Sequence, residues 1–414
     1  MTEVASSTPR DALPRPRIRL AVLGATGSIG RQAIDVIERD PRFEVVALAG
    51  GRNTTLLGEQ ARRLRPSLVV TAADANRRAL GDLPARTAHA TGDEALEALA
   101  ARDDLDLVVV GTGGIIGLRP VLAALRAGTP VATANKEALV AGGHLVMPIA
   151  REHAALAARE APAGPLATAL GWIRPIDSEH SAIWQCLAGE APGSAAGFLL
   201  TASGGPFLDL DPAELATVTP AQALRHPTWS MGPKITIDSA TLANKGLEVV
   251  EAHWLYDAPY EAIEVVIHPQ SVVHSAVRFV DGSLKAQLGT PDMRLPIQYA
   301  LTYPARLPSP ARAPDLIEIG SLDFRAPDLG RFPALRIARD AGRIGPWATA
   351  ALIAADDVAV ARFLAGSLDF PGIPRLLERA VETFGGRSGA DPTIDDLTSM
   401  DHEIRAAFAS WTAA

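Results

Sequence analysis

The chain has 414 residues, of which 48% are hydrophobic and 21% are charged, a composition typical of globular proteins and unlike that of disordered or fibrous chains. This length exceeds what one hydrophobic core usually organises, so we expect about two or three domains. The net charge of −8 argues against nucleic acid or an anionic membrane surface as a partner.

The sequence offers no sign of export or of a membrane segment. No stretch approaches the roughly 18 consecutive apolar residues that a membrane-spanning helix needs. The single cysteine, Cys186, cannot form a disulfide within the chain, so we expect a buried thiol in a protein of the reducing cytoplasm. Residues 1–16 lack an apolar run after their arginines, which indicates a disordered tail rather than a secretory signal.

Residues 17–165 alternate short apolar, β-rich runs with helical patterns, the rhythm of an α/β domain with a parallel sheet. Apolar residues at helical spacing predict helices over Gly30–Arg39 and Thr54–Leu64. The runs that we predict as strands are Ile18–Leu23, Phe43–Ala49, Ser67–Thr71, Leu107–Val110 and Pro130–Thr133.

The rest of the chain predicts three further parts. An Ala-rich helical segment, Gly142–Leu170, leads into an α+β region over 166–301, with prolines marking a semi-rigid connector over 302–330. Residues 331–414 follow a helical pattern, from which we expect a C-terminal helical bundle. The strands predicted in the α+β region are Phe198–Thr201, Ile235–Ile237, Ile263–Ile267, Val272–Val280 and Ser283–Leu288.

A glycine-rich loop, Gly24-Ala25-Thr26-Gly27-Ser28-Ile29-Gly30, follows the first predicted strand and opens the first helix. Glycines let a backbone approach a pyrophosphate closely, and a helix N-terminus presents free N–H groups to it. The spacing is G-x-x-G-x-x-G rather than the dinucleotide consensus G-x-G-x-x-G, and a tight turn without a ligand is the alternative. The strand–loop–helix setting favours a dinucleotide site in a Rossmann-like domain.

The end of the second strand indicates which dinucleotide is bound. An acidic residue there would bind the ribose 2′-hydroxyl of NAD, but this chain continues Gly50-Gly51-Arg52-Asn53. The guanidinium of Arg52 suits a 2′-phosphate, so we predict NADPH, with a solvated surface charge as the alternative. Lys136, after the fifth strand, is placed for a substrate or nicotinamide, or is an ordinary helix-start charge.

Two pairs of acidic residues predict a site in which three carboxylates bind a hard cation. Asp177 and Glu179 follow the strand-like run Trp172–Ile176, and in an extended segment residues two apart project to the same side. Glu248 and Glu251 lie on a predicted helix, where residues three apart share a face. Oxygen ligands without cysteine suit Mg²⁺ or Mn²⁺ better than structural zinc. Exposed salt-bridging acids are the alternative.

Short polar loops elsewhere supply hydroxyl, amide and ammonium donors that match a phosphate. These donors are Ser203, Ser239, Asn244 and Lys245, although each alone would be an ordinary turn or helix cap. Between them, Leu224–Gly232 combines His226, Trp229 and Met231 without periodicity. This mixture is typical of a lid that closes over substrate, and a packed loop with a buried Trp229 is the alternative.

Six motifs, in order along nearly the whole chain, resemble the 1-deoxy-D-xylulose-5-phosphate reductoisomerase family: GATGSIG, NKEALV, PIDSEH, SGGPF, HPTWSMGPKITIDSATLANKGLE and HPQSVVHS. The resemblance implies a V-shaped, three-part chain that forms a homodimer through its central domain. It also implies NADPH- and metal-dependent isomerisation and reduction of 1-deoxy-D-xylulose 5-phosphate in the non-mevalonate isoprenoid pathway. The implied metal is Mg²⁺ or Mn²⁺, with Co²⁺ as a further option.

The resemblance also assigns residues to roles. Metal ligands are Asp177, Glu179 and Glu248, which with Lys136 and His226 form the implied catalytic set. Substrate contacts are Ser178, Glu179, Ser203, His226, Ser239, Asn244, Lys245 and Glu248. Cofactor contacts are Thr26, Gly27, Ser28, Ile29, Gly51, Arg52, Asn53, Asn135, Lys136, Glu137 and Gly232.

The sequence departs from the family pattern in two notable places. The connection between Lys136 and Asp177 is longer than expected, with Glu152–Leu170 as an extended helix or an added loop. Asp356 and Asp357 replace a more usual Asn and Glu at a helix start, and we expect no effect on the chemistry. Two rival functions are a simple NADP-dependent dehydrogenase, which needs no carboxylate triad, and an NADPH-sensing regulatory protein without turnover.

Overall fold

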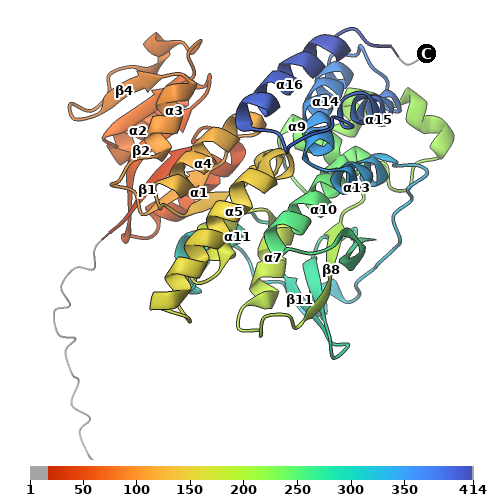
Figure 1. Ribbon diagram of the computed structural model, residues 1–414, viewed down its shortest axis with the longest axis horizontal. Coiled ribbons are helices and arrows are strands. Elements are labelled where there is room, and N and C mark those ends of the chain that lie inside the picture. The colour runs from red at the N-terminus through yellow and green to blue at the C-terminus, as the bar shows by residue number, and fades with distance from the viewer. Residues whose placement is uncertain (1–16, 413–414) are drawn as a thin grey trace, which may run out of the picture.

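The computed structural model describes residues 17–412 (Figure 1), so the predicted disordered tail lies outside the described residues. Seven parallel strands form the first sheet, in the order β4-β3-β2-β1-β5-β6-β7. This confirms the predicted parallel sheet, whose strands are β1 (Ile18–Leu23), β2 (Phe43–Gly50), β3 (Leu68–Thr71), β4 (Ala88–Thr91), β5 (Leu107–Val110), β6 (Val131–Thr133) and β7 (Ile173–Pro175).

Helices cover both faces of this sheet, as the near-continuous apolar strands require. Along β1, Leu20 and Val22 pack into one core while Ala21 and Leu23 pack into the other, because successive side chains of a strand point to opposite faces. One face carries α1 (Ser28–Glu38), α2 (Thr54–Leu64) and α11 (Arg294–Thr302), and the other carries α3 (Asp93–Ala100), α4 (Leu118–Arg126) and α5 (Lys136–Glu160).

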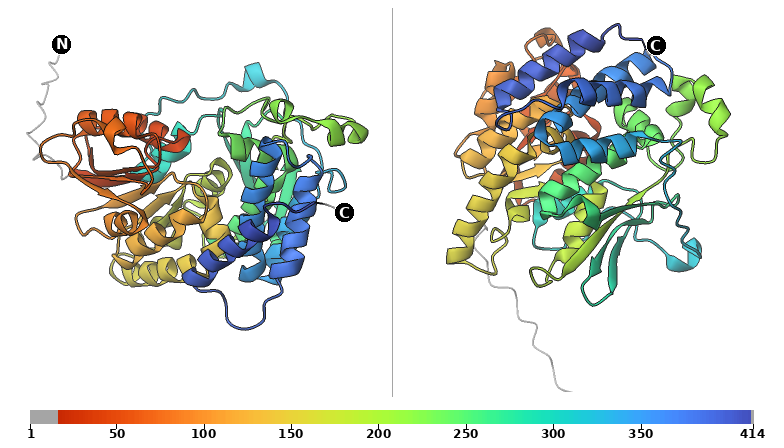
Figure 2. Two further views of the ribbon diagram at one scale, coloured as in Figure 1. Left: turned by 90° about the horizontal axis from the view of Figure 1, so that it is seen from above. Right: turned by 45° about the vertical axis from the view of Figure 1, so that its right-hand side comes forward.

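Two segments that follow the predicted boundary at residue 165 belong with the first sheet. One is a strand of this sheet, and the other is a helix that packs on it. β7 pairs with β6, and α11 packs beside α1 (Figure 2). The predicted helix Gly142–Leu170 is also placed differently, because α5 begins earlier, at Lys136, and ends at Glu160. Turns and the short helix α6 (Ala169–Trp172) then lead into β7.

The second sheet has four strands in the order β11-β10-β8-β9, antiparallel except for the β8–β9 pair. The strands are β8 (Ala195–Ala202), β9 (Ile263–Ile267), β10 (Val273–Phe279) and β11 (Leu284–Leu288), which confirms four of the five predictions in this region. Two helices, α7 (Ser178–Leu187) and α10 (Ala243–Tyr256), pack against this sheet. They carry the acidic residues singled out in the sequence.

The predicted strand at Ile235–Ile237 is wrong, since these residues lie in helix α9 (Pro233–Thr241). The β-branched run favours a strand by propensity. Pro233, however, occupies the first helical turn, where its missing N–H costs no hydrogen bond. Lys234 and Asp238, four residues apart, pair across the next turn at 2.8 Å and further stabilise the helix.

The C-terminal region is the predicted helical bundle, in which α14 (Pro346–Leu364) packs against its neighbours and against α5. Its other helices are α13 (Ala334–Ile344), α15 (Gly372–Phe384) and α16 (Ile394–Phe408). The proline-rich connector contains the short helix α12 (Leu316–Ile319). An ion pair between Arg119 and Asp395 at 2.5 Å also ties α4 to α16, so the bundle contacts the first domain directly.

Several short turns complete the chain. They are α8 (Pro220–Ala223) and the 3₁₀ segments η1 (Arg77–Leu80), η2 (Ile115–Gly117), η3 (Pro212–Thr217) and η4 (Tyr260–Ala262). Over residues 17–412, every helix falls short of the length or apolar character needed to cross a bilayer. Cys186 is a buried free thiol, as predicted.

The glycine loop allows a stability prediction. A Cβ at Gly30 would lie 2.2 Å from the Gly24 carbonyl oxygen, whereas a Cβ at Gly51 would meet no atom within 4 Å. Gly30→Ala should therefore lower the free energy of unfolding by about 1–3 kcal/mol through overpacking, and Gly51→Ala should change it by less than about 0.5 kcal/mol. Urea unfolding measures both, and equal values for the two variants would contradict the close approach.

Candidate functional site

A cavity of about 180 Å³ opens beside the carboxyl ends of β6 and β7, under the segment 226–232. Segments far apart in the sequence meet in its walls. The ten residues predicted to act in catalysis or to bind metal or substrate all line it: Lys136, Asp177, Ser178, Glu179, Ser203, His226, Ser239, Asn244, Lys245 and Glu248. Ser28, Ile29 and Gly232, predicted to contact the cofactor, line it too.

Carboxylates and ammonium groups alternate on one wall of the cavity. Lys136 Nζ lies 2.7 Å from Asp177 Oδ2 and 3.1 Å from Glu248 Oε1. Lys245 Nζ contacts Glu248 Oε2 and lies 3.6 Å from Glu179 Oε1. The two ammonium groups thus provide the positive charge that three closely spaced carboxylates need in a buried site.

The start of helix α7 brings Asp177 and Glu179 together. Asp177 is the N-cap of α7, and its carboxylate accepts a hydrogen bond from the Glu179 backbone N–H at 3.1 Å. The predicted extended geometry for Asp177 and Glu179 is therefore wrong, because β7 ends at Pro175 and the helix begins at Ser178. The short polar Asp favours a cap over continued strand.

A sharp bend between α9 and α10 aims the remaining groups at the same cavity. Leu242 adopts a left-handed backbone conformation, with φ of 60°, between the two helices. Ser239 therefore lies before the bend, whereas Asn244 and Lys245 follow it in the first turn of α10. Asn244 donates from its amide to Glu248 Oε1 at 2.6 Å and accepts from Lys136 Nζ at 2.7 Å.

Burial and neighbouring charges shift the pKa values of Asp177 and Glu179 in opposite directions. Burial opposes ionisation of Asp177, but the charges of Lys136, His180 and Lys245 outweigh it and lower its pKa. Burial raises the pKa of Glu179 to about 8, with Glu248 and Asp177 adding to the rise against Lys245. Without a metal ion, Glu179 thus holds its proton more readily than an exposed glutamic acid does.

Two more buried groups lie behind this wall. The nearest oxygens or nitrogens of Asp177, His180 and Glu248 all lie within 4.8 Å of one another. However, His180 Nε2 faces Glu251 at 3.1 Å, and among the described residues lining the cavity Glu179 is included whereas His180 is not. Glu179 therefore lines the cavity together with Asp177 and Glu248, whereas His180 lies behind it.

His226 joins the two predicted phosphate-binding serines. Its Nδ1 accepts hydrogen bonds from the backbone N–H groups of Thr228 and Trp229, at 3.1 and 2.9 Å. That leaves the proton on Nε2, which lies 2.9 Å from Ser203 Oγ and 3.2 Å from Ser239 Oγ. Burial lowers the pKa of His226, so the ring is neutral at physiological pH and fixes the start of the lid segment.

A second cleft lies at the carboxyl ends of β1, β2, β3 and β5, where open α/β sheets bind their ligands. Gly24, with φ of 78°, approaches the next loop so closely that a Cβ would lie 2.6 Å from the Gly111 carbonyl carbon. Residues that line this cleft include Gly24, Gly50, Gly51, Thr71 and Thr112. The glycine cradle fits a dinucleotide, and Thr71 and Thr112 are wall residues that the sequence analysis missed.

The other residues predicted to contact the cofactor lie nearby, and several of them already have a hydrogen-bond or ion-pair partner within the protein. Arg52 is largely exposed and pairs with Asp74 at 3.1 Å. Asn53 caps α2 by accepting from Leu56 N–H. Asn135 is buried, accepts from Ala138 N–H and donates to the Gly114 carbonyl, while Glu137 faces Lys234. Thr26 and Gly27 lie in the loop before α1.

The raised pKa of Glu179 predicts a pH effect on the metal-free protein. The folded chain keeps its proton up to pH about 8, whereas the unfolded chain releases it near 4.5. This contribution to stability is complete below pH about 4.5 and is lost as the pH rises toward 8. In a chelator, the melting temperature should fall more between pH about 6 and about 8.5 in the wild type than in Glu179→Gln, and equal falls would contradict the assignment.

Comparison with protein families agrees along the chain. The family model "1-deoxy-D-xylulose 5-phosphate reductoisomerase" matches residues 20–143. Its C-terminal domain model matches residues 173–256, and the model "DXP reductoisomerase C-terminal domain" matches residues 288–407. The three matches follow one another in the order that the sequence motifs predict.

Individual relatives agree over almost the full length. The 1-deoxy-D-xylulose 5-phosphate reductoisomerase of Pelotomaculum thermopropionicum is 48% identical, over 93% of this chain and 96% of its own; that of Thermosynechococcus vestitus is 45% identical, over 96% and 93%. Among solved structures, the Zymomonas mobilis reductoisomerase in complex with NADPH has a TM-score of 0.82 at 38% identity, covering 96% of this chain and 99% of that one. A DOX-P reductoisomerase complex with NADPH, fosmidomycin and magnesium has a TM-score of 0.85 at 38% identity, covering 95% and 98%. This chain belongs to the 1-deoxy-D-xylulose 5-phosphate reductoisomerase family.

Proposed function

We propose that this chain isomerises 1-deoxy-D-xylulose 5-phosphate and reduces the product to 2-C-methyl-D-erythritol 4-phosphate, using NADPH and a divalent cation. The observation that carries the proposal is one cavity wall on which Asp177, Glu179 and Glu248 converge beside two buried ammonium groups. Solved relatives bind NADPH and magnesium, and we infer the same for this chain.

The donor set fits a hard cation. In the structure, the charges of Lys136 and Lys245 stand among oxygen ligands from three acids, which suit Mg²⁺ or Mn²⁺, with Co²⁺ as a further option. Bound there, the cation would supply charge that stabilises negative charge developing on substrate oxygens, and NADPH would supply the hydride. Lys136 would orient an oxygen of the sugar, since its ammonium already donates to Asp177 and Asn244.

A second set of groups that line the cavity suits the phosphate of the substrate. Ser203 and Ser239 hydroxyls meet at His226 Nε2, and the Asn244 amide and the Lys245 ammonium lie on the adjoining helix. We propose that these groups bind the phosphate and that Ser178 contacts the sugar. Binding energy at this remote group would orient the reacting carbons and favour lid closure by Trp229 and Met231, which line the cavity.

The cofactor cleft leads toward this cavity, because Ser28 and Ile29 at the start of α1 line the cavity itself. We propose that the glycine loop holds the pyrophosphate and that Arg52 pairs with the 2′-phosphate, exchanging its exposed partner Asp74. Asn135 and Asn53 already cap helices, so their roles toward the cofactor would be to shape the backbone around it. The nicotinamide would lie beside Lys136.

We further propose that the enzyme acts as a cytoplasmic homodimer in the non-mevalonate isoprenoid pathway. The family resemblance supports the pathway, and the single buried thiol is consistent with a reducing compartment. Exposed apolar side chains of Leu316, Ile317 and Phe324 on the connector suit contact with a second copy. The domains would be 17–165 for NADPH, 166–301 for catalysis and dimerisation, 302–330 as connector and 331–414 as the helical domain, with β7 and α11 packed on the first.

Substitution of one ligand tests the function. Glu248→Gln should slow NADPH oxidation with 1-deoxy-D-xylulose 5-phosphate and Mg²⁺ by more than about 100-fold, because even residues that only support a metal ligand are worth 10–100-fold. NADPH binding, followed by its fluorescence, should persist. The matched control is Glu264→Gln, which alters an exposed pair with Arg278 and should keep wild-type turnover.

A chelator distinguishes the rival functions. A simple dehydrogenase would stay active in excess EDTA, and a sensing protein would bind NADPH without forming product under any condition. The proposed reductoisomerase should lose turnover in EDTA and regain it with Mg²⁺ or Mn²⁺. Normal turnover in Glu248→Gln would contradict the ligand assignment.

A further inference from the structure

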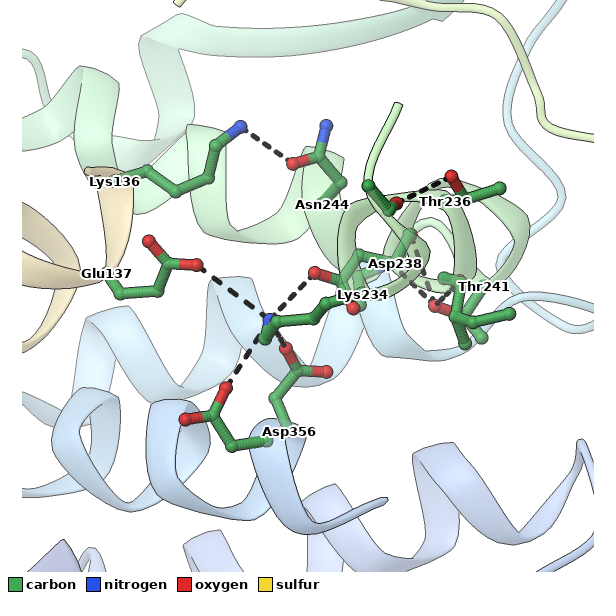
Figure 3. A network of polar contacts seen from close by, with 12 residues as sticks. Lys136, Glu137, Lys234, Thr236, Asp238, Thr241, Asn244 and Asp356 are labelled. Atoms are coloured by element: carbon green, nitrogen blue, oxygen red, sulfur yellow. Dashed lines mark hydrogen bonds and ion pairs between the residues drawn. The ribbon is translucent and has the colours of Figure 1, made fainter. Parts of the chain in front are cut away.

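The ammonium of Lys234 lies at the centre of a second charge cluster, behind the cavity wall (Figure 3). It contacts Asp238 at 2.8 Å in its own helix and Asp356 at 2.5 Å in α14. Glu137 of α5 and Asp357 of α14 lie farther out, at 3.9 and 3.8 Å. One lysine side chain therefore joins three helices that belong to different parts of the fold.

This cluster and the cavity use adjacent residues of the same helices. On α5, Lys136 faces the cavity, whereas the next residue, Glu137, faces Lys234. On α9, Ser239 lines the cavity, whereas the preceding Asp238 bonds to Lys234. Figure 3 shows Lys136 reaching Asn244 on one side and Glu137 pointing to Lys234 on the other. A shift in the Lys234 cluster would therefore move two groups proposed to bind substrate.

The carboxyl groups of this cluster are strongly dependent on Lys234. The side chains of Asp238 and Asp356 are 4% and 1% exposed, and within residues 17–412 the Oδ1 atom of each has no hydrogen-bond partner. Burial raises the pKa of both groups, and Asp356 raises that of Asp238 further, against Lys234. These two buried acids therefore depend on one ammonium group, that of Lys234, for compensating charge.

Asp357, one of the two outer acids, also pairs with a residue of the C-terminal bundle. Asp357 pairs with Arg405 of α16 at 2.7 Å, and Arg405 also pairs with Asp401 at 2.6 Å. The cluster is therefore continuous with the C-terminal bundle. The bundle gives the cluster a rigid support, because α14 packs against α13, α15 and α16.

Lys234 also lies two residues after the lid segment 226–232. His226 fixes the first end of this segment through bonds to the Thr228 and Trp229 backbone. At the second end, the Thr236 hydroxyl donates to the Gly232 carbonyl at 2.8 Å, and Lys234 anchors the same helical turn. The segment 226–232 is thus fixed at both ends, by His226 inside the cavity and by the helical turn of Lys234 behind it.

We propose that Lys234 is a positioning residue that fixes the second end of the lid and the substrate face of α9 against α14 of the C-terminal bundle. It does not touch substrate; it acts through Ser239 and Gly232. This inference rests on the proposed function only for its kinetic consequence. It also assigns a use to Asp356, for which the sequence predicted no effect on the chemistry. The predicted position of Asp356 at a helix start is wrong, because α14 begins ten residues earlier, at Pro346.

Substitution of Lys234 and Asp356 tests the proposal. Lys234→Met should raise the KM for 1-deoxy-D-xylulose 5-phosphate at least about tenfold, since small displacements of positioning groups have effects up to about 100-fold. The dissociation constant for NADPH should change less than this KM, because the glycine loop and Arg52 lie outside the Lys234 cluster. Asp356→Asn should have a smaller effect than Lys234→Met, since its amide oxygen can still accept a hydrogen bond from Lys234 and Asp238 remains to balance the charge, whereas Asp356→Leu should behave like Lys234→Met.

Hydrogen–deuterium exchange of residues 226–241 in the substrate-free protein gives a readout independent of turnover. Exchange should be faster than in the wild type for Lys234→Met and Asp356→Leu, and only slightly faster for Asp356→Asn. It should be unchanged for Arg343→Met, which breaks an exposed pair with Glu261. NADPH binding reports that each variant is folded. Wild-type exchange and KM in Lys234→Met, or equal losses in both Asp356 variants, would overturn the proposal. Absence of turnover in the wild type would instead refute the proposed function while leaving the exchange test intact.

Discussion

The structure depends on the balance of charge among Asp177, Glu179 and Glu248. Buried carboxylates are strongly destabilising unless they are paired or bound to a cation. Here Lys136 and Lys245, themselves buried, provide that balance. The contact between Lys136 and Glu248 joins residues 112 positions apart, so the same interaction that neutralises the site also holds the first domain against the second.

The elements around the site follow from this constraint. The parallel sheet ends at β7, whose last residue leads directly into the capping Asp177, and the left-handed Leu242 turns α10 so that Asn244, Lys245 and Glu248 face the same acids. Behind α9, Lys234 repeats the arrangement with one ammonium among buried acids. The segment 226–232 therefore lies between the hydrogen bonds of His226 inside the cavity and the Lys234 cluster, which packs against α14 of the C-terminal bundle.

Much of this could be predicted from the sequence, because local patterns determine it. The glycine loop and the alternation of strands and helices predicted the parallel sheet. The acids, the polar loops and the family resemblance predicted the cavity residues, although the extended geometry expected for Asp177 and Glu179 was wrong. The strand predicted at Ile235–Ile237 was wrong. The preference of its β-branched residues for a strand is outweighed by Pro233, which starts the helix, and by the Lys234–Asp238 ion pair, which stabilises it. The short edge strand β4 was missed, since its residues are polar or half-exposed. Contacts such as Lys234 with Asp356 depend on tertiary packing; the i,i+4 spacing of Lys234 and Asp238 was their one local signal.

The central claim is that the three acids now balanced by lysines form one cation site. Anomalous scattering from a crystal soaked in Mn²⁺ locates a bound ion without reference to activity. The account predicts a peak within coordination distance of carboxylate oxygens of Asp177, Glu179 and Glu248, with the ammonium groups of Lys136 and Lys245 displaced from their present positions. A fully occupied ion elsewhere, with the lysines still paired to these acids, would contradict it.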